Sequence, residues 1–365
     1  MKILIGADIV PTKETEELFI AGNPRDLFGD ICDVVKQADR TVVNLECALT
    51  TSDNAIKKFG PALKADPKCV ETLKNLGVTD VMLANNHVFD YGIQGLRDTV
   101  DALERVGLPY TGIGENDTDS RKPYIVEQDG KKVGFINVCE HEFSYALPNR
   151  VGANPYNPYL TMRDIRALKG QVDYVVVLYH GGKELCSYPS PRLRLLCQEM
   201  VENGANAVIT QHSHCIGCYE EYKGAHIVYG QGNFHFYWGK MKEIWYESLL
   251  VELDFDQGVA IKFYPFTSHE KCLTLAKGEA YDKVMHAFKT RNKELQNGEW
   301  KKGWKAFCET ASERYIKIAN RENSHDWFAH YLDCEAHTDV WRELFPTWNA
   351  TNELPPANPT PKDKA

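Results

Sequence analysis

The stretch Asp80-Val81-Met82-Leu83-Ala84-Asn85-Asn86-His87-Val88-Phe89-Asp90 passes from an apolar run directly into polar side chains. The apolar half is typical of a short buried strand, and a helical pattern follows from about Ile93 to Gly107. The chain repeats this order of strand, polar turn and helix many times. Such alternation predicts βαβ units and a layered α/β domain.

The remaining expected strands are short apolar runs bounded by polar or glycine residues. They cover residues 2–6, 41–44, 124–127, 132–138, 174–179, 207–210, 226–229, 248–254 and 258–265, beside 80–84. Helix signals lie between them: Asp66-Pro67 opens one helix that Gly77 closes, and Thr161 opens another that Gly170 closes. We therefore assign residues 1–275 to one α/β domain.

After about Lys277 the strand signals stop and helical spacing takes over. Helices are predicted over 281–297, 300–320 and 325–345, with Trp304, Trp327 and Trp341 among their apolar positions. This extension, 276–350, would cover a face of the main domain or form a homodimer contact. Residues 351–365 are rich in Pro, Asn and Lys and are predicted to be a disordered tail.

The most informative pattern is the set of residues that follow the predicted strands. If these strands lie side by side, their carboxyl ends share one sheet edge, where open α/β sheets place their sites. That edge would collect carboxylate, amide and imidazole groups, several of them histidines. The residues concerned are Asp8, Asn44, Glu46, Asn86, His87, Asp90, Glu140, His141, His180, His212, His214 and Asn233.

Oxygen and imidazole ligands together favour Mn, Zn or Fe(II) over a thiolate site. The set is too large for one tetrahedral ion and suits two divalent ions that share a carboxylate, roughly 3.5–4 Å apart. In an extended backbone, the spacing of His212 and His214 would place both rings on one side. Glu140, His141 and Asn233 are predicted to line a substrate pocket.

The motifs resemble those of a known family. The series Gly6-Ala7-Asp8, Asn44-Leu45-Glu46, Asn85-Asn86-His87 with Asp90 and Gly92, His180-Gly181-Gly182, His212-Ser213-His214 and Gly232-Asn233-Phe234 is similar to that of the CapA proteins of capsule poly-γ-glutamate synthesis. These proteins are related to the calcineurin-like metallophosphoesterases. The resemblance spans about residues 1–266 and implies an α/β/β/α sandwich, here with a C-terminal helical extension.

The resemblance also implies roles. Asp8 and His214 would bind a first metal, and Glu46 would bridge to a second. Asn86, His180 and His212 would complete the second metal, and His87, held by Asp90, would act on the leaving group. One position departs from the metallophosphoesterase pattern, because Val10 stands where a further histidine ligand is expected.

These roles predict a metal-dependent hydrolase. A metal-activated water would attack a phosphoester or a poly-γ-glutamyl amide of an anionic small molecule or polymer. The alternative is a non-catalytic polymer-binding or assembly protein that keeps the fold, which Val10 favours. Lys57, Lys58 and Arg150 could attract an anionic substrate, but a solvated surface is the favoured interpretation for these loop residues.

Composition narrows the classes of partner and compartment. With 42 Lys and Arg against 51 Asp and Glu the net charge is −9, which argues against a nucleic-acid binder. No window approaches the ~20 apolar residues of a membrane span, so we expect no membrane anchor. Eleven scattered cysteines indicate reduced thiols and a cytoplasmic protein. Cys215 and Cys218 are interpreted as ordinary thiols, and His325, His330 and His337 as side chains that bind no metal.

Overall fold

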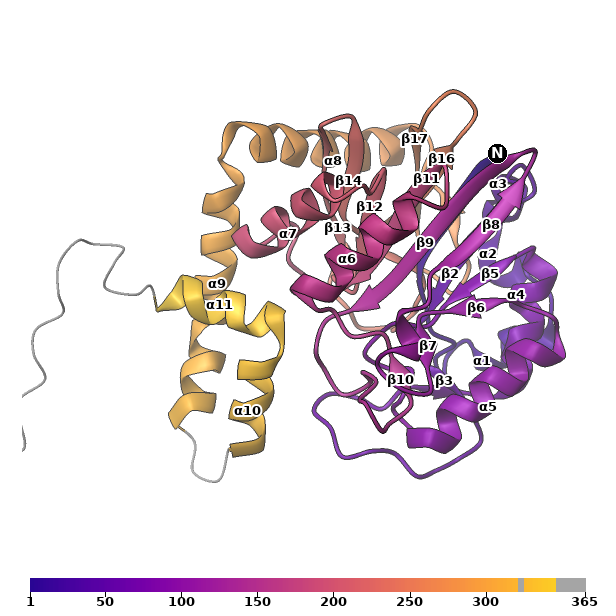
Figure 1. Cartoon of the computed structure of the whole chain (residues 1–365), viewed down its shortest axis with the longest axis horizontal. Helices are drawn as coiled ribbons and strands as arrows, with labels where there is room; N and C mark the ends of the chain where they lie inside the picture. The colour runs from indigo at the N-terminus through magenta and orange to yellow at the C-terminus, as the bar shows by residue number, and fades with distance from the viewer. Residues whose placement is uncertain (321–324, 346–365) are drawn as a thin grey trace, which may run out of the picture.

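Two β-sheets lie face to face between layers of helices in the computed structural model, which describes residues 1–320 and 325–345 (Figure 1). The first sheet has the order β18-β17-β16-β1-β2-β5-β6, with β15 also paired to β1. The second has the order β13-β14-β12-β11-β9-β8. The carboxyl ends that were expected on one sheet therefore come from two sheets that pack together.

The strand bounds follow. The first sheet contains β1 (Lys2–Ile9), β2 (Arg40–Leu45), β5 (Asp80–Met82), β6 (Tyr110–Thr111), β15 (Asn233–His235), β16 (Glu247–Asp254), β17 (Ala260–Thr267) and β18 (Thr274–Leu275). The second contains β8 (Tyr124–Gln128), β9 (Lys131–Cys139), β11 (Tyr174–His180), β12 (Ala207–Gln211), β13 (Ile216–Tyr222) and β14 (Ala225–Gln231). Two short pairs are β3 (Ala48–Leu49) with β4 (Lys64–Ala65), and β7 (Ile113–Gly114) with β10 (Gly152–Ala153).

Alternation along the central strands explains how both sheets are buried on both faces. In β1, Ile3 and Ile5 join the core between the sheets, whereas Leu4 points to the helices on the outer face. In β11, Leu178 lies between the sheets and Val177 faces outward. Side chains alternate across a strand, so a continuous apolar run is what a doubly covered strand requires.

Helices cover the two outer faces. Those over the first sheet are α1 (Glu16–Ala21), α2 (Arg25–Phe28), α3 (Ile31–Val35), α4 (Val70–Leu76) and α5 (Gly92–Arg105). Those over the second sheet are α6 (Pro158–Lys169) and α7 (Pro191–Glu202), and α8 (Glu279–Asn297) packs against β13. The predicted α/β/β/α sandwich is thus confirmed, including a C-terminal helical extension.

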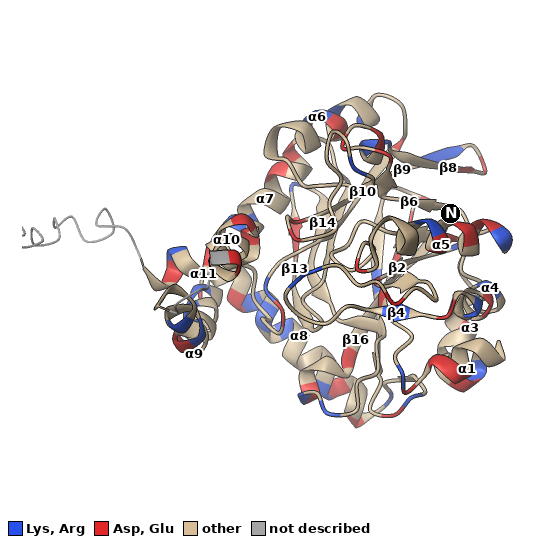
Figure 2. Ribbon diagram, turned by 90° about the horizontal axis from the view of Figure 1, so that it is seen from below, with Lys and Arg blue, Asp and Glu red and all other residues tan. Residues whose placement is uncertain are grey.

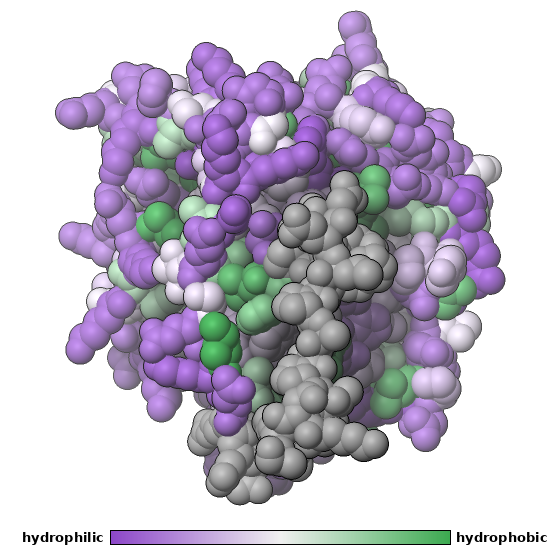
Figure 3. Space-filling model, turned by 90° about the vertical axis from the view of Figure 1, so that its left-hand side faces the viewer, coloured by the Kyte–Doolittle hydropathy of each residue, from purple (hydrophilic) through white to green (hydrophobic). Residues whose placement is uncertain are grey.

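The extension consists of α9 (Trp300–Asn320), α10 (His325–Asp333) and α11 (Glu335–Leu344). These helices group beside α7 and α8 at the opposite end of the molecule from α1 and α4 (Figures 1 and 2). Trp304, Tyr315 and Tyr331 join the core under the second sheet. The face of the molecule that carries these three helices is mainly hydrophilic, with apolar side chains in small groups (Figure 3).

Several local expectations were wrong. The helix predicted over 325–345 is broken at Cys334, whose backbone is extended and precedes α11. Helix α6 begins at Pro158 rather than Thr161, because Asn157 accepts hydrogen bonds from the N–H groups of Tyr159 and Leu160. Strand β13 was not predicted. The proposed tail, 351–365, lies outside the described residues.

Within residues 1–320 and 325–345, no helix combines the length and the apolar character needed to cross a bilayer.

Candidate metal centre

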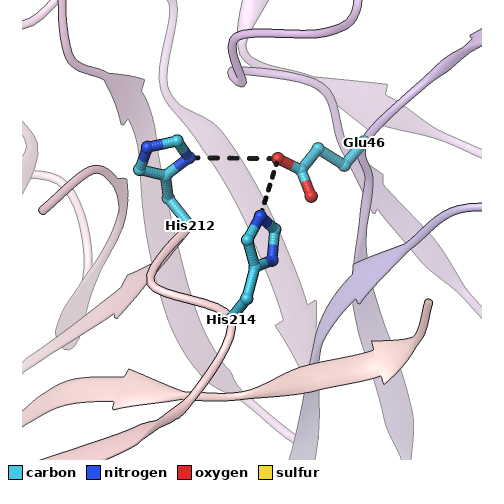
Figure 4. A group of neighbouring side chains, drawn as sticks. All are labelled: Glu46, His212 and His214. Carbon is cyan, nitrogen blue, oxygen red and sulfur yellow. Dashed lines mark ion pairs between the residues drawn. The ribbon is translucent and has the colours of Figure 1, made fainter. Parts of the chain in front are cut away.

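Glu46, which follows β2, lies at the centre of a buried cluster. Its Oε1 atom is 3.2 Å from His180 Nε2, 3.9 Å from His214 Nε2 and 4.0 Å from His212 Nδ1. Figure 4 shows the last two rings directed at this oxygen. The strand ends of both sheets thus converge on one carboxylate.

Asp8, in β1, lies on the other side of the same cluster. Its carboxylate is 3.7 Å from His180 Nδ1 and 3.5 Å from His214 Nδ1. The side-chain amide of Asn44 donates to Asp8 Oδ1 at 2.6 Å, and the backbone N–H of His212 donates to Oδ2 at 3.2 Å. These bonds fix the Asp8 carboxylate toward the histidines.

The loop after β12 reaches the cluster in an unexpected conformation. His212 and His214 have φ angles of 83° and 52°, in the left-handed region that non-glycine residues rarely adopt. The extended backbone considered for this pair is therefore absent, and the turn itself brings both rings to Glu46. Such strain is typical of functional loops.

Two groups of possible ligands share Glu46. One contains Asp8, Glu46 and His180, and the other contains Glu46, His212 and His214, with the ligand atoms of each within 4.8 Å of one another. Asn86 Oδ1 is a further possible ligand atom for a metal, 2.9 Å from His180 Nε2. Two atoms bound to one ion at about 2.1 Å lie roughly 3 Å or more apart, so these separations suit a common ion.

The cluster also contains polar atoms whose bonding capacity is unused. Both carboxylate oxygens of Glu46 and Nδ1 of His212 are buried and have no hydrogen-bond partner among the described residues. Leaving buried polar atoms unpaired costs about 1–3 kcal/mol each. The residues present therefore fit one or two divalent cations, which would satisfy these atoms.

The pKa shifts of His214 and Glu46 also favour a bound cation. Burial disfavours a charged His214, but the carboxylates of Glu46 and Asp8 outweigh it and raise the pKa of His214 to about 10. Burial likewise opposes ionisation of Glu46, yet His214 and His180 hold its pKa well below its usual range. A cation bound by His214 would displace the proton that this raised pKa favours, so metal binding would release a proton.

Asn233, in β15, lies behind the cluster. Its Oδ1 atom is 2.8 Å from His214 Nδ1, and its amide donates to the carbonyl of Trp245. A His214 that donates from Nδ1 presents Nε2 toward Glu46. The structure thus places Asn233 where it orients a histidine rather than in the cavity at the site.

A second group of charges lies beside Asn86. His87 Nδ1 is 2.6 Å from Asp90 Oδ2, and Lys58 Nζ is 2.5 Å from Asp90 Oδ1. The side chain of Lys58 is only 3% exposed, so its assignment to the solvated surface was wrong. Lys57 is 89% exposed. Arg150 is half-buried and lies over the rings of Phe89 and Tyr145.

Glu140 and His141 are engaged by other parts of the chain. Glu140 is buried and accepts hydrogen bonds from Tyr179, Gly182 and Arg192. His141 pairs with Glu335 at the start of α11, with Nδ1 2.6 Å from Oε1. The structure does not bring either side chain into the ligand cluster.

Glu142 was missed. Its Oε1 atom lies 3.7 Å from His212 Nε2, and its Oε2 atom accepts from Asn86 at 3.3 Å. The same carboxylate therefore contacts two predicted ligands from a loop that follows β9. Its position beyond a strand end was the available signal, because it comes directly after Glu140 and His141.

The cysteines and the C-terminal histidines stay outside both ligand groups. All eleven cysteines lie among the described residues and none forms a disulfide. His330 stacks on Phe143, and His337 Nδ1 is 2.6 Å from the hydroxyl of Tyr315. The side chain of His325 lies outside the described residues.

The fold and this cluster define a layered α/β protein with a candidate metal centre at its strand ends. Residues 2–237 match the family described as "Bacterial capsule synthesis protein PGA_cap", and the chain belongs to that family. The resemblance seen in the motifs is thereby confirmed.

Two relatives show the extent of the similarity. The chain is 30% identical over 268 residues to the "Capsule biosynthesis protein CapA" of Bacillus anthracis, covering 70% of this chain and 64% of the relative. It is 29% identical over 236 residues to the "PGA biosynthesis protein CapA" of Bacillus subtilis (strain 168), covering 63% and 61%. The chain thus spans less than two thirds of each relative.

Solved structures with a similar arrangement are more distant. A hypothetical protein from Thermus thermophilus has 18% identity and a TM-score of 0.47, covering 73% of this chain and 99% of the other. A phosphatase from Mycoplasma pneumoniae has 16% identity and a TM-score of 0.46, covering 78% and 96%. A putative 5'-nucleotidase from Staphylococcus aureus has 17% identity and a TM-score of 0.44, covering 81% and 58%.

Proposed function

We propose that this protein is a metal-dependent hydrolase that acts on an anionic substrate in capsule polymer synthesis. The observation that carries the proposal is Glu46, a buried carboxylate whose oxygens accept no hydrogen bond from a described residue and which is surrounded by three histidines. Divalent ions bound there, with Mn, Zn or Fe as candidates, would supply an activated water and stabilise negative charge on the reacting group.

We assign the ligands as Asp8, Glu46, Asn86, His180, His212 and His214. Glu46 is the shared ligand because both groups contain it. Asn44 and Asn233 hold Asp8 and His214 in place through hydrogen bonds of 2.6 and 2.8 Å. Such supporting contacts fix the direction of a ligand and, for histidine, its tautomer.

His87 is the proposed proton donor to the leaving group. It lines the cavity at the cluster, and its Nδ1 atom is engaged by Asp90, which leaves Nε2 to exchange a proton with a bound substrate. Asp90 would stabilise the charged imidazolium, while Lys58 and the N–H of Leu63 hold Asp90. This arrangement suits general acid catalysis of either phosphoester or γ-glutamyl amide cleavage.

The metal assignment is tested by elemental analysis of the purified full chain after loading with Mn or Zn. We expect one or two ions per chain in the wild type and none in His212→Ala/His214→Ala. The variant Cys215→Ala/Cys218→Ala, in the same segment but outside the ligand groups, should keep its metal. A loaded wild type without metal would contradict the assignment.

The role of His87 is tested by separate measurements of metal content and turnover. His87→Ala should keep its metal but lose hydrolysis by a factor of about 10² or more, the usual contribution of a general acid. Phosphoester and γ-glutamyl amide substrates are assayed in parallel with added Mn. Unchanged turnover in His87→Ala would remove it from the mechanism.

A second candidate is a non-catalytic binding or assembly protein with the same fold. Val10 favours it, because this side chain is buried in the apolar core at the position where the metallophosphoesterase pattern has a ligand. Metal binding without turnover of either substrate class would support this candidate.

Residues 1–275 would form the domain that carries the site and 276–350 a helical extension, in a cytoplasmic protein whose thiols are reduced. The chain would bind neither nucleic acid nor membrane and could pair as a homodimer, which light scattering would detect.

A further inference from the structure

The C-terminal helices form one wall of a cavity that reaches the candidate metal centre at Asn86 and His212. Asn86, His87 and His212 line this cavity of about 280 Å³ on the side of the strand ends. On the opposite side it is lined by residues of α9, α10 and α11. These are Arg314, Trp327, His330, Tyr331, Ala336 and His337.

This wall is held against the main domain by specific contacts. Glu335 accepts from the backbone N–H of His141 at 2.8 Å, and Asp339 accepts from Arg192 at 2.9 Å. The rings of Phe59 and Trp327 lie 3.8 Å apart between centroids. The helices are therefore part of the cavity and not a loosely attached tail.

The positively charged side chains that line the cavity differ in their ion pairs. Lys58 is bound to Asp90 at 2.5 Å. Lys183, beyond β11, lies beside Glu184 in the same cavity but forms no close ion pair with a described residue, and Arg314 is an exposed residue of α9 that contacts Tyr331. Lys183 and Arg314 are thus the positive side chains best able to receive a ligand that enters the cavity.

The space available limits the ligand. Pockets for small molecules usually measure about 300–1,000 Å³, so this cavity is at the small end of the range. A neighbouring cavity of about 520 Å³ shares Lys58, Phe59, Glu142 and His330 with it. A compact molecule, or the end of a longer chain lying in the outer cavity, could therefore reach the strand ends.

We propose that Arg314 and Lys183 form a subsite for an oxyanion of the substrate that does not itself react. The substrate would be a compact anion or a chain end carrying a phosphate or carboxylate group. Arg314 lies outside residues 2–237, which match the family, whereas Lys183 lies within them. This inference rests on the proposed function, because it assumes that the bound anion is a substrate. Binding of the anion to the subsite can nevertheless be measured without turnover.

The test uses the full chain loaded with Mn and titrates it calorimetrically with inorganic phosphate and, separately, with glutarate. Arg314→Ala and Lys183→Ala should each weaken binding of the preferred anion at least about tenfold, the scale of one charge-assisted contact. The control is Lys317→Ala, one turn further along α9, which pairs with Glu313 and does not line this cavity. It should bind like the wild type, and metal content should be equal in all four proteins.

The outcomes separate the two proposals. Weakened binding in both variants supports the subsite even if no substrate is hydrolysed, in which case only the proposed hydrolase function fails. Unchanged binding in Arg314→Ala, equal weakening in Lys317→Ala, or no binding of either anion to the wild type would overturn the subsite. Preference for phosphate or glutarate identifies the chemical source of the oxyanion.

Discussion

Lys57 and Lys58 are adjacent in the sequence but have opposite environments. Lys57 extends into solvent toward Asp326, whereas Lys58 is enclosed and contacts both Asp90 and His87. The difference depends on Asp90, which lies 32 residues away along the chain. Only the folded structure reveals this contact, which explains why sequence patterns indicated a surface loop.

Replacement of Lys58 should therefore destabilise the protein, while replacement of its neighbour should not. In Lys58→Met the buried Asp90 carboxylate loses its cationic partner, and breaking such a pair costs about 3–5 kcal/mol. Urea unfolding of the metal-free proteins measures the difference. Lys57→Met is the matched control and should keep the wild-type midpoint. Equal midpoints for both variants would contradict the burial of Lys58.

The candidate ligands illustrate what single positions can indicate. Asp8, Glu46, His180, His212 and His214 could be predicted because each follows an apolar strand in a recognisable motif. Glu142 belongs to no such motif, and its approach to His212 depends on the path of the loop after β9. The roles of these residues stay predictions until metal and turnover are measured.

At the scale of elements, apolar strands were easier to predict than helix boundaries and half-polar strands. Runs such as 174–179 are apolar throughout because helices and the other sheet cover both faces. Strand β13 carries Glu220 and Glu221, and its buried Glu220 is satisfied by Arg194 from α7. Its apolar alternation is therefore weak, and the partner that permits a buried carboxylate comes from another helix.

Helix α11 should dock less firmly at alkaline pH. Its first residue, Glu335, bonds to His141, which raises the pKa of His141 against the opposing effect of burial; Asp333 and Glu140 act in the same direction. Because the folded pKa lies above the unfolded value of about 6.5, the stabilisation is complete below pH 6.5. It is lost as the pH rises through the folded pKa.

Hydrogen exchange of α11, measured from about pH 6 to 9 and corrected for the intrinsic rate, tests this expectation. The wild type should lose protection above about pH 6.5, the unfolded pKa of histidine. Glu335→Gln and His141→Asn each remove the pair and should both show a flatter profile with lower protection at the acidic end. A flat wild-type profile would rule out this contribution of the pair.

At the scale of the whole molecule, the interface between the sheets supports the site. Ile3 and Ile5 of β1 meet Leu178 of β11 in the core cluster that joins the two sheets. Asp8 is the last but one residue of β1, and His180 is the last residue of β11. Packing in this interface therefore sets the separation of the strand ends that carry the candidate ligands.

Leu178→Ala should destabilise the protein by about 2–5 kcal/mol, because it removes a fully buried side chain and leaves a cavity between the sheets. Leu195→Ala makes the same chemical change on α7, at a side chain that is 59% exposed, and should have little effect. Denaturant unfolding of both variants is the measurement. A similar loss in the two would show that Leu178 does not pack as described.

The sharing of Glu46 by two ligand groups has a thermodynamic consequence. If an ion occupied each group, the two ions would not bind independently, since each would alter the charge and the position of a ligand that the other needs. Their coupling would be reciprocal: the first ion would change the affinity for the second by the same factor in either order of addition. Metal titrations of this protein should therefore depart from the curve of independent sites, and Glu46→Gln should abolish that departure along with high affinity at both positions.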